Sequence, residues 1–145
     1  MEYWPLSADL SRHREIAPMS WLWVRPHLVL AWHQRLLNEF GGAPGLRDIA
    51  LLEGALDRPK NLAAYNPESS VEQLAGLYGF AGAKAHAFTD GNERVAFAVM
   101  VTFLKAHGKS LDTSEAEATE VMLKVAASTM DETALHAWLT KNCRG

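Results

Sequence analysis

The sequence contains a single cysteine and no cluster of basic residues. Cys143 is the one cysteine among 145 residues, so no disulfide can form within the chain, and such usage is typical of proteins from a reducing compartment. Lys and Arg together number 14 against 17 Asp and Glu, which gives a net charge of −3. The electrostatic footprint of a nucleic-acid-binding protein is therefore missing. We expect a cytoplasmic protein with no direct nucleic-acid partner.

Long hydrophobic runs are also missing. No apolar segment reaches the roughly 18 residues that a membrane-spanning helix needs, and Glu2, Asp9 and Arg12 lie where a secretion signal would be apolar. We therefore expect no membrane partner. A chain of this length can bury a substantial core as one domain. Residues 1–20 lack a clear period and are expected to form an N-terminal extension, which leaves residues 21–145 for the domain.

The chain shows a succession of helical patterns, each bounded by residues that cap or stop helices. Proline at a first helical position, Ser or Asp at N-caps and glycine after the last turn mark the boundaries. The predicted helices cover about residues 26–39, 49–58, 71–85, 91–107, 115–127 and 132–140. Pro59 is expected to end the second of them, so that residues 59–67 form a loop. The fold class predicted from this pattern is all-α, a small helical bundle.

The most informative stretch is the polar segment 86–94, because it runs directly into an apolar helix. The side chains from Val95 to Leu104 are apolar on nearly every face, and such a helix must be buried. The first turn of a helix has backbone N–H groups without helical partners and carries the positive end of the helix dipole. The segment in front of this helix is therefore suited to bind an anion such as a phosphate.

The side chains of this segment are those that phosphoryl or nucleotidyl transfer requires. His86 could take a proton from an attacking hydroxyl near neutral pH, and Asp90 is a hard oxygen ligand suited to Mg²⁺. Gly91 lets the backbone approach a phosphate, Asn92 can donate from its amide, and Arg94 can form bidentate bonds to a phosphate. Such a transfer depends mainly on positioning and charge neutralisation.

The residues alone leave structural alternatives open at these positions. Asp90 and Glu93 have the spacing of a capping box, in which Asp90 would be only the N-cap and Glu93 its partner. His86 could be a hydrogen-bonded histidine without a catalytic role, and Arg94 a solvated or paired side chain. His33, on the first predicted helix, is expected to be packed or capped rather than catalytic.

The segment 86–94 resembles the signature of the Fic/Doc (Fido) family, H-x-F-x-(D/E)-(G/A)-N-x-R. The matching positions are His86, Phe88, Asp90, Gly91, Asn92 and Arg94. The rest of the chain is similar to the Doc branch of this family, the death-on-curing toxins of toxin–antitoxin modules. The similar positions outside the motif include His33, Gly41, Gly42, Gly45, Asp48, Leu52, Glu53, Ala55, Leu56, Arg58, Pro59, Phe103, Leu104 and Gly108. The resemblance covers about residues 22–141 and implies the Fido fold.

The resemblance also implies a role for each matching residue. His86 would be the general base that activates a target hydroxyl, Asp90 the Mg²⁺ ligand, and Arg94 the residue that holds a phosphate of ATP. Gly91 and Asn92 would line the anion site.

Two structural roles follow from the same resemblance. Phe88 would anchor the loop in the core. In the family a flap that aligns the target chain precedes the motif, which places it here within residues 59–66, with Asn61, Tyr65 and Asn66 as target-binding residues. From the residues alone, this stretch could equally be a plain connector.

The resemblance implies transfer from ATP to a protein hydroxyl but leaves the reaction open. Doc phosphorylates a threonine of elongation factor Tu, whereas most Fic enzymes transfer AMP. The residue before the motif Arg is Lys in typical Doc members and Gly in typical AMP-transferring members, but it is Glu93 here. A carboxylate in the anion site would repel a phosphate, unless it turns away, caps the loop or pairs with Arg94 or Lys84.

Our leading hypothesis is a Doc-like toxin that phosphorylates a Ser or Thr hydroxyl of a translation factor. The alternatives are AMP transfer and an inactive Fido-fold binding module. The inhibitory string of self-regulating Fic proteins, (S/T)-x-x-x-E-(G/N), does not occur in the sequence, so a separately encoded antitoxin is expected as a partner. Trp21, Trp23 and Trp32 form an aromatic cluster that is either a wall of the antitoxin groove or plain core.

Overall fold

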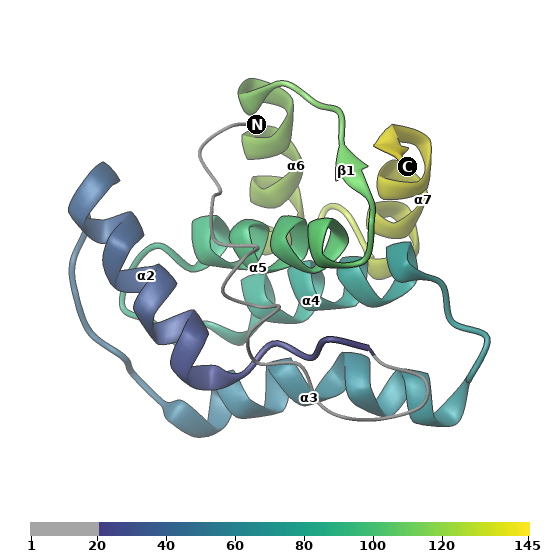
Figure 1. The fold of residues 1–145 in the computed structure, drawn as a ribbon. Helices are drawn as coiled ribbons and strands as arrows, with labels where there is room; N and C mark the ends of the chain where they lie inside the picture. The colour runs from purple at the N-terminus through teal and green to yellow at the C-terminus, as the bar shows by residue number, and fades with distance from the viewer. Residues whose placement is uncertain (1–20) are drawn as a thin grey trace.

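The computed structural model describes residues 21–145, and this part of the chain is almost entirely helical (Figure 1). Its helices are α2 (Pro26–Phe40), α3 (Ile49–Tyr65), α4 (Val71–Ala85), α5 (Asn92–Ala106), α6 (Glu115–Ala126) and α7 (Glu132–Asn142). Two short strands, β1 (Ser110–Leu111) and β2 (Cys143–Arg144), pair in antiparallel fashion. The predicted all-α fold is confirmed. The extension expected over residues 1–20 lies outside the described residues.

Helix α5 is the centre of the bundle. Every residue from Val95 to Leu104 is buried, because α2, α4, α6 and β1 pack around the helix. The burial predicted from its apolar sequence is therefore confirmed. Burying one large apolar side chain stabilises a fold by about 1.5–3 kcal/mol, so this helix supplies much of the stabilising free energy. Its N-terminus, where the motif segment ends, is fixed in place as a result.

Helices α4 and α5 approach each other closely because α4 presents glycines to its neighbour. A Cβ atom built at Gly79 would lie 2.6 Å from the Met100 sulfur, and one built at Gly82 would lie 3.1 Å from the Ala96 Cβ. A larger residue at either position would push the two helices apart. Since the motif loop joins the end of α4 to the start of α5, this contact also sets the distance that the loop must span.

Most of the predicted helix starts are confirmed by their caps. Ser70 and Gln73 form the complete capping box of α4. Ser114 and Asp131 accept hydrogen bonds from backbone N–H groups in the first turns of α6 and α7. Asp48 caps α3 in the same way, through the N–H of Ala50.

The predicted end of the second helix at Pro59 is wrong. Helix α3 continues through Pro59 to Tyr65, so residues 59–65 are helical turns rather than a loop. Proline lacks the N–H that would bond to the preceding turn, but Pro59 is buried and Leu62 packs against the core. The packing of α3 along α4 offsets the lost hydrogen bond.

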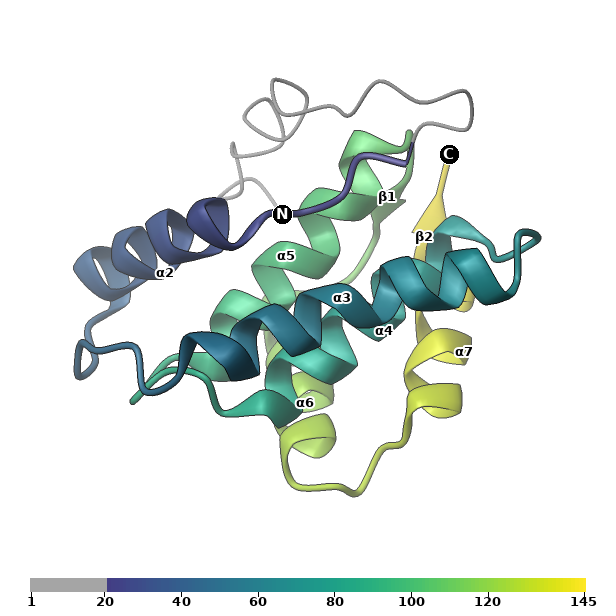
Figure 2. The same cartoon turned by 90° about the horizontal axis from the view of Figure 1, so that it is seen from below.

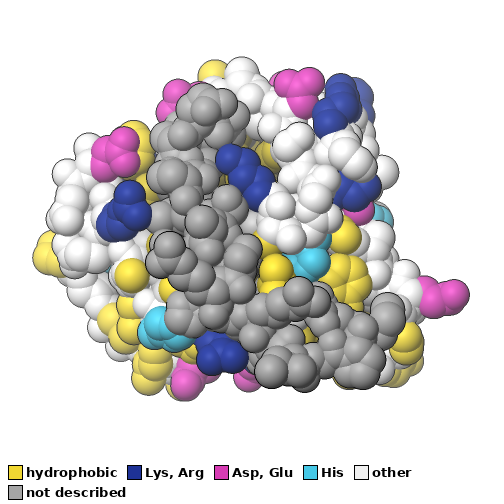
Figure 3. Space-filling model, in the orientation of Figure 1, with side chains coloured by type: hydrophobic (Ala, Val, Ile, Leu, Met, Phe, Trp, Pro, Cys, Tyr) yellow, Lys and Arg dark blue, Asp and Glu magenta, His cyan; other side chains and the backbone are white. Residues whose placement is uncertain are grey.

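Two features of the described residues, the length of their apolar helices and the distribution of their basic side chains on one face, can be compared with the sequence. None of the described helices is both long and apolar enough to cross a bilayer. On the face drawn in Figure 3, the described Lys and Arg side chains lie singly or in pairs among other residues and do not merge into a basic patch.

The segment that precedes α2 is held against the core by His107. The backbone N–H of Leu22 donates to His107 Nε2 at 3.0 Å, and His107 Nδ1 donates to the Phe103 carbonyl at 2.8 Å. An imidazole that accepts at one nitrogen and donates at the other is neutral. The rings of Trp21 and Phe103 lie against the imidazole, so a proton added to His107 would disrupt a partly buried contact.

We predict that the free energy of unfolding falls as the pH is lowered through about 6.5, the ordinary pKa of histidine. Burial lowers the pKa of His107 in the folded chain. The unfolded chain therefore takes up a proton at a higher pH and is favoured as the pH falls. In the His107→Gln variant, urea unfolding between about pH 7 and about pH 5 should show a shallower slope of free energy against pH. Equal slopes in the two proteins would contradict this role of His107.

Candidate active site

The motif loop turns sharply at both of its ends. His86 ends α4 with left-handed backbone angles (φ 50°, ψ 42°), and Gly91 precedes α5 in the same region (φ 78°, ψ 16°). Between these turns, the side chain of Asn92 closes the loop on itself. Asn92 Oδ1 accepts from the Phe88 N–H at 3.1 Å, and Asn92 Nδ2 donates to the Phe88 carbonyl at 2.9 Å. Phe88 is buried, as expected for a residue that anchors the loop.

The connector between α2 and α3 runs alongside the motif loop. Leu46 and Phe88 form an antiparallel bridge, and the Arg47 N–H donates to the Ala87 carbonyl at 2.7 Å. The contact is close, because a Cβ atom at Gly45 would lie 2.9 Å from the hydroxyl oxygen of Thr89. The backbone of Gly45 also has φ +127°, a conformation that residues with a side chain rarely adopt. The connector therefore supports the loop through backbone atoms.

Helix α2 and the residues just after it hold Asp90 at two atoms. His33 Nε2 donates to the Asp90 carbonyl at 2.8 Å, and the His33 ring stacks on Phe88 with centroids 3.8 Å apart. Just beyond the end of α2, the Ala43 N–H donates to Asp90 Oδ2 at 3.1 Å. The sequence predicts a packed or capped His33, and the structure confirms this. It adds that the residue fixes the motif loop, a role that depends on contacts between distant parts of the chain.

The Asp90 carboxylate is exposed and favours its ionised form. The N–H groups of Ala43 and then Gly91 donate to its two oxygens and lower the pKa of Asp90, and the charge of Arg94 adds to the effect. The N-cap of α5 is Gly91, and no side chain caps this helix. The alternative in which Asp90 is only an N-cap with Glu93 as its partner is therefore not what the structure contains.

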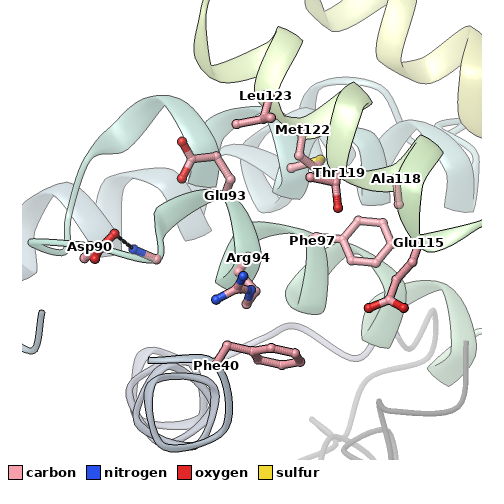
Figure 4. A pocket seen from close by; sticks show the side chains of 11 residues that line it. Phe40, Asp90, Glu93, Arg94, Phe97, Glu115, Ala118, Thr119, Met122 and Leu123 are labelled. Carbon is pink, nitrogen blue, oxygen red and sulfur yellow. Dashed lines mark hydrogen bonds between the residues drawn. The ribbon is translucent and has the colours of Figure 1, made fainter. Parts of the chain in front are cut away.

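A pocket of about 260 Å³ opens at the N-terminus of α5 (Figure 4). The motif residues line one end, and α5 and α6 line the other with apolar side chains together with Glu115 and Thr119. The lining residues are Phe40, Asp90, Gly91, Glu93, Arg94, Phe97, Glu115, Ala118, Thr119, Met122 and Leu123. The Arg94 guanidinium lies over the Phe40 ring, 4.4 Å from its centroid. The Glu93 carboxylate extends away from Arg94.

The structure brings together four of the predicted site residues at this pocket: Asp90, Gly91, Glu93 and Arg94. His86 is exposed and does not line the pocket. The Asn92 side chain is buried in the loop, so its amide is not directed at the pocket, and only its backbone N–H remains available for an anion. Sequence reasoning missed Phe40 and Ala43, since one is a lone apolar residue and the other acts through its backbone.

The predicted flap residues lie elsewhere. Asn61 and Tyr65 are in the last turns of α3, and Asn66 is its C-cap. Helix α3 begins beside the motif loop and is 17 residues long, so its far end lies about 24 Å along the axis. Figure 2 shows the two ends of α3 on opposite sides of the molecule. The loop expected over residues 59–66 is thus wrong, and the connector over residues 41–48 occupies the position beside the motif.

The tryptophan cluster is divided between core and surface. Trp32 is 1% exposed, so it belongs to the core and cannot form the wall of a groove. Trp21 and Trp23 are half-buried and stack on Phe103. The groove hypothesis is therefore wrong for Trp32.

Comparison with known proteins agrees with the geometry of the loop. The sequence profile of the Fic/DOC family matches residues 23–104, a range that contains α2, the connector, the motif loop and most of α5. The chain belongs to the Fic/DOC family. It is also similar to the protein kinase doc of Escherichia phage P1, with 28% identity over 85 residues that make up 59% of this chain and 68% of the phage protein.

The donor atoms of this Fic/DOC site are compatible with Mg²⁺. Asp90 is an ionised carboxylate that accepts two N–H bonds, and a carboxylate has further lone pairs for a metal. No group of three or more metal-binding side chains occurs among the described residues. Mg²⁺ commonly binds through one or two carboxylates together with water and substrate phosphates. A Mg²⁺ ion held by Asp90 would supply charge neutralisation for a bound polyphosphate.

The closed motif loop of this Fic/DOC protein should depend on Asn92. We predict that Asn92→Ala lowers the free energy of unfolding by about 2–4 kcal/mol, because it leaves the buried N–H and carbonyl of Phe88 without partners. Urea denaturation would measure the change. The matched control is Asn38→Ala, since Asn38 is exposed on α2, and this variant should stay within about 0.5 kcal/mol of wild type. Equal losses in the two variants would contradict the prediction.

Proposed function

We propose that this Fic/DOC protein is a Doc-like enzyme that transfers a phosphoryl group from ATP to a Ser or Thr hydroxyl of a protein target. The observation that carries the proposal is the pocket in front of α5, where an ionised Asp90 and the guanidinium of Arg94 lie together at a helix N-terminus. The similarity to the protein kinase doc of phage P1 favours phosphoryl transfer over AMP transfer.

The site would act by positioning a polyphosphate. Arg94 and the first N–H groups of α5 would bind phosphate oxygens, and Asp90 would hold Mg²⁺. The exposed imidazole of His86 would accept the proton of the target hydroxyl as the hydroxyl oxygen bonds to the γ-phosphorus and the bond to ADP breaks. Because His86 lies outside the pocket lining, the target would approach from the solvent side of the motif loop.

The connector over residues 41–48 is our candidate for the segment that aligns the target. It is exposed throughout and fixed by hydrogen bonds to Ala87 and Thr89. The guanidinium of Arg47 also donates to the carbonyl of His86 at 3.2 Å. A target chain lying along the connector would therefore be held close to the proposed base. This segment replaces residues 59–66 as the flap.

We further propose the biological setting that the Doc resemblance suggests. The target would be a translation factor similar to elongation factor Tu, and a separately encoded antitoxin would inhibit the enzyme. The support is the similarity to the phage protein.

Substitution of His86 tests the proposed reaction. We predict that His86→Asn removes transfer of γ-labelled phosphate from ATP to protein in a cell lysate, with a loss of at least about 100-fold. Asn is chosen because His86 has a left-handed backbone that Asn tolerates better than Ala. The control is His136→Asn on α7, which should retain transfer. Retained activity in His86→Asn would contradict the role of His86 as general base.

The position of the label distinguishes the candidate functions. Label that transfers only from the α-phosphate would mean AMP transfer instead of phosphorylation. Absence of label from either position, in a protein that folds normally, would point to a Fido-fold binding module. This last candidate is kept because of the charge of the pocket: three carboxylates line it, those of Asp90, Glu93 and Glu115, together with one guanidinium.

The negative charge of Glu93 should oppose the binding of a nucleotide in the pocket. Its carboxylate lines the pocket and forms no ion pair among the described residues. We predict that Glu93→Gln strengthens the binding of ATP with Mg²⁺ about two- to fivefold at low ionic strength, and less as salt screens the charge. Isothermal titration would measure the dissociation constants. Glu53→Gln makes the same charge change on α3 and should have a smaller effect; equal effects would contradict a local role for Glu93.

A further inference from the structure

We propose that Phe40 is a positioning residue that holds the Arg94 guanidinium in the pocket by a cation–π contact. This inference rests on the proposed function, which assigns Arg94 to a nucleotide phosphate. It adds a residue outside the motif, at the C-terminal end of α2, to the parts that bind the nucleotide.

The geometry is that of a cation–π pair. The central carbon of the guanidinium lies 4.4 Å from the centroid of the Phe40 ring, well inside the distance of about 6 Å at which such contacts are attractive. Figure 4 shows the guanidinium on the face of the ring that looks toward Arg94, and both side chains line the pocket. A planar guanidinium stacked on a ring still presents its N–H groups at its edge. Arg94 can therefore contact Phe40 and a phosphate at the same time.

Among the described residues, the contact with Phe40 restrains the position of the Arg94 guanidinium. No carboxylate of residues 21–145 forms an ion pair with Arg94, although Glu93 is its neighbour in sequence. Arg94 is exposed, and an exposed arginine without a partner samples many rotamers. The ring limits this freedom, and the Glu93 carboxylate extends away from the guanidinium. A phosphate that enters the pocket then meets a cation already in place.

The C-terminal end of α2 and the residues just after it contact both the Arg94 guanidinium and the Asp90 carboxylate. Phe40 is the last residue of the helix, and Gly41 and Gly42 follow with φ +82° and +123°. This turn directs the Ala43 N–H to the Asp90 carboxylate. A side chain at Gly42 would come within 3.0 Å of that carboxylate. The ring of Phe40, which is 41% exposed, and the amide for Asp90 thus come from one short stretch.

Substitution of Phe40 in two backgrounds tests the inference. Phe40→Leu should weaken the binding of ATP with Mg²⁺ about two- to fivefold, the size expected for one cation–π contact at an exposed site. Phe40→Tyr keeps the ring and should bind ATP as wild type does. In an Arg94→Ala background, Phe40→Leu should cause no further loss, because Phe40 acts through Arg94. The same loss in both backgrounds, or no loss in either, would overturn the inference.

A second readout separates this inference from the proposed function. The aromatic ring should shift the Nε–H resonance of Arg94 upfield in wild type and in Phe40→Tyr, and Phe40→Leu should abolish that shift. If wild type bound no ATP, the proposed function would fail, and the resonance would decide whether Phe40 holds Arg94. Absence of the shift in wild type would overturn the inference. Melting temperatures close to wild type in the Leu and Tyr variants would exclude loss of the fold as the cause of either change.

Discussion

The complete burial of α5 is the constraint on which the rest of the molecule depends. A helix that is apolar on every face can exist in water only if other elements cover it on all sides, and here α2, α4, α6 and β1 do so. The N-terminus of such a helix cannot shift without disturbing the whole core. The backbone N–H groups and the guanidinium at this terminus are therefore presented by a rigid support, as a preorganised anion site requires.

The motif loop in front of this helix is held mainly by hydrogen bonds that involve backbone groups. Asn92 closes the motif loop on the peptide groups of Phe88, and the connector over residues 41–48 bonds to it through main-chain groups. Asp90 in turn receives an N–H from Ala43. Such contacts leave the functional side chains free to meet solvent and ligand. They also make the geometry of the loop depend on glycines where the two segments touch.

Helix positions and motif chemistry could be predicted from sequence because they depend on local patterns. Ser70, Ser114 and Asp131 mark helix starts through contacts within one turn. The apolar residues 95–104, directly after the motif, predict a buried helix. The course of residues 59–65 could not be predicted, because packing on α4 overrides the local effect of Pro59. Phe40 was missed for a similar reason. Phe40 contacts Arg94, which lies 54 positions further along the chain. A single phenylalanine in the sequence does not indicate such a contact.

The two walls of the pocket differ in how freely they can change. The wall from α5 is anchored in the core by the buried Phe97. Helix α6, by contrast, contributes Glu115, Thr119 and Leu123, which follow one another at one-turn spacing and are all exposed. Exchanges at exposed positions usually alter stability little. This face of α6 is therefore where selection or design can change the shape and charge of the far end of the pocket while the end at Asp90 and Arg94 stays intact. The fold thus separates the part of the pocket that the core holds in place from the part whose side chains can change at little cost in stability.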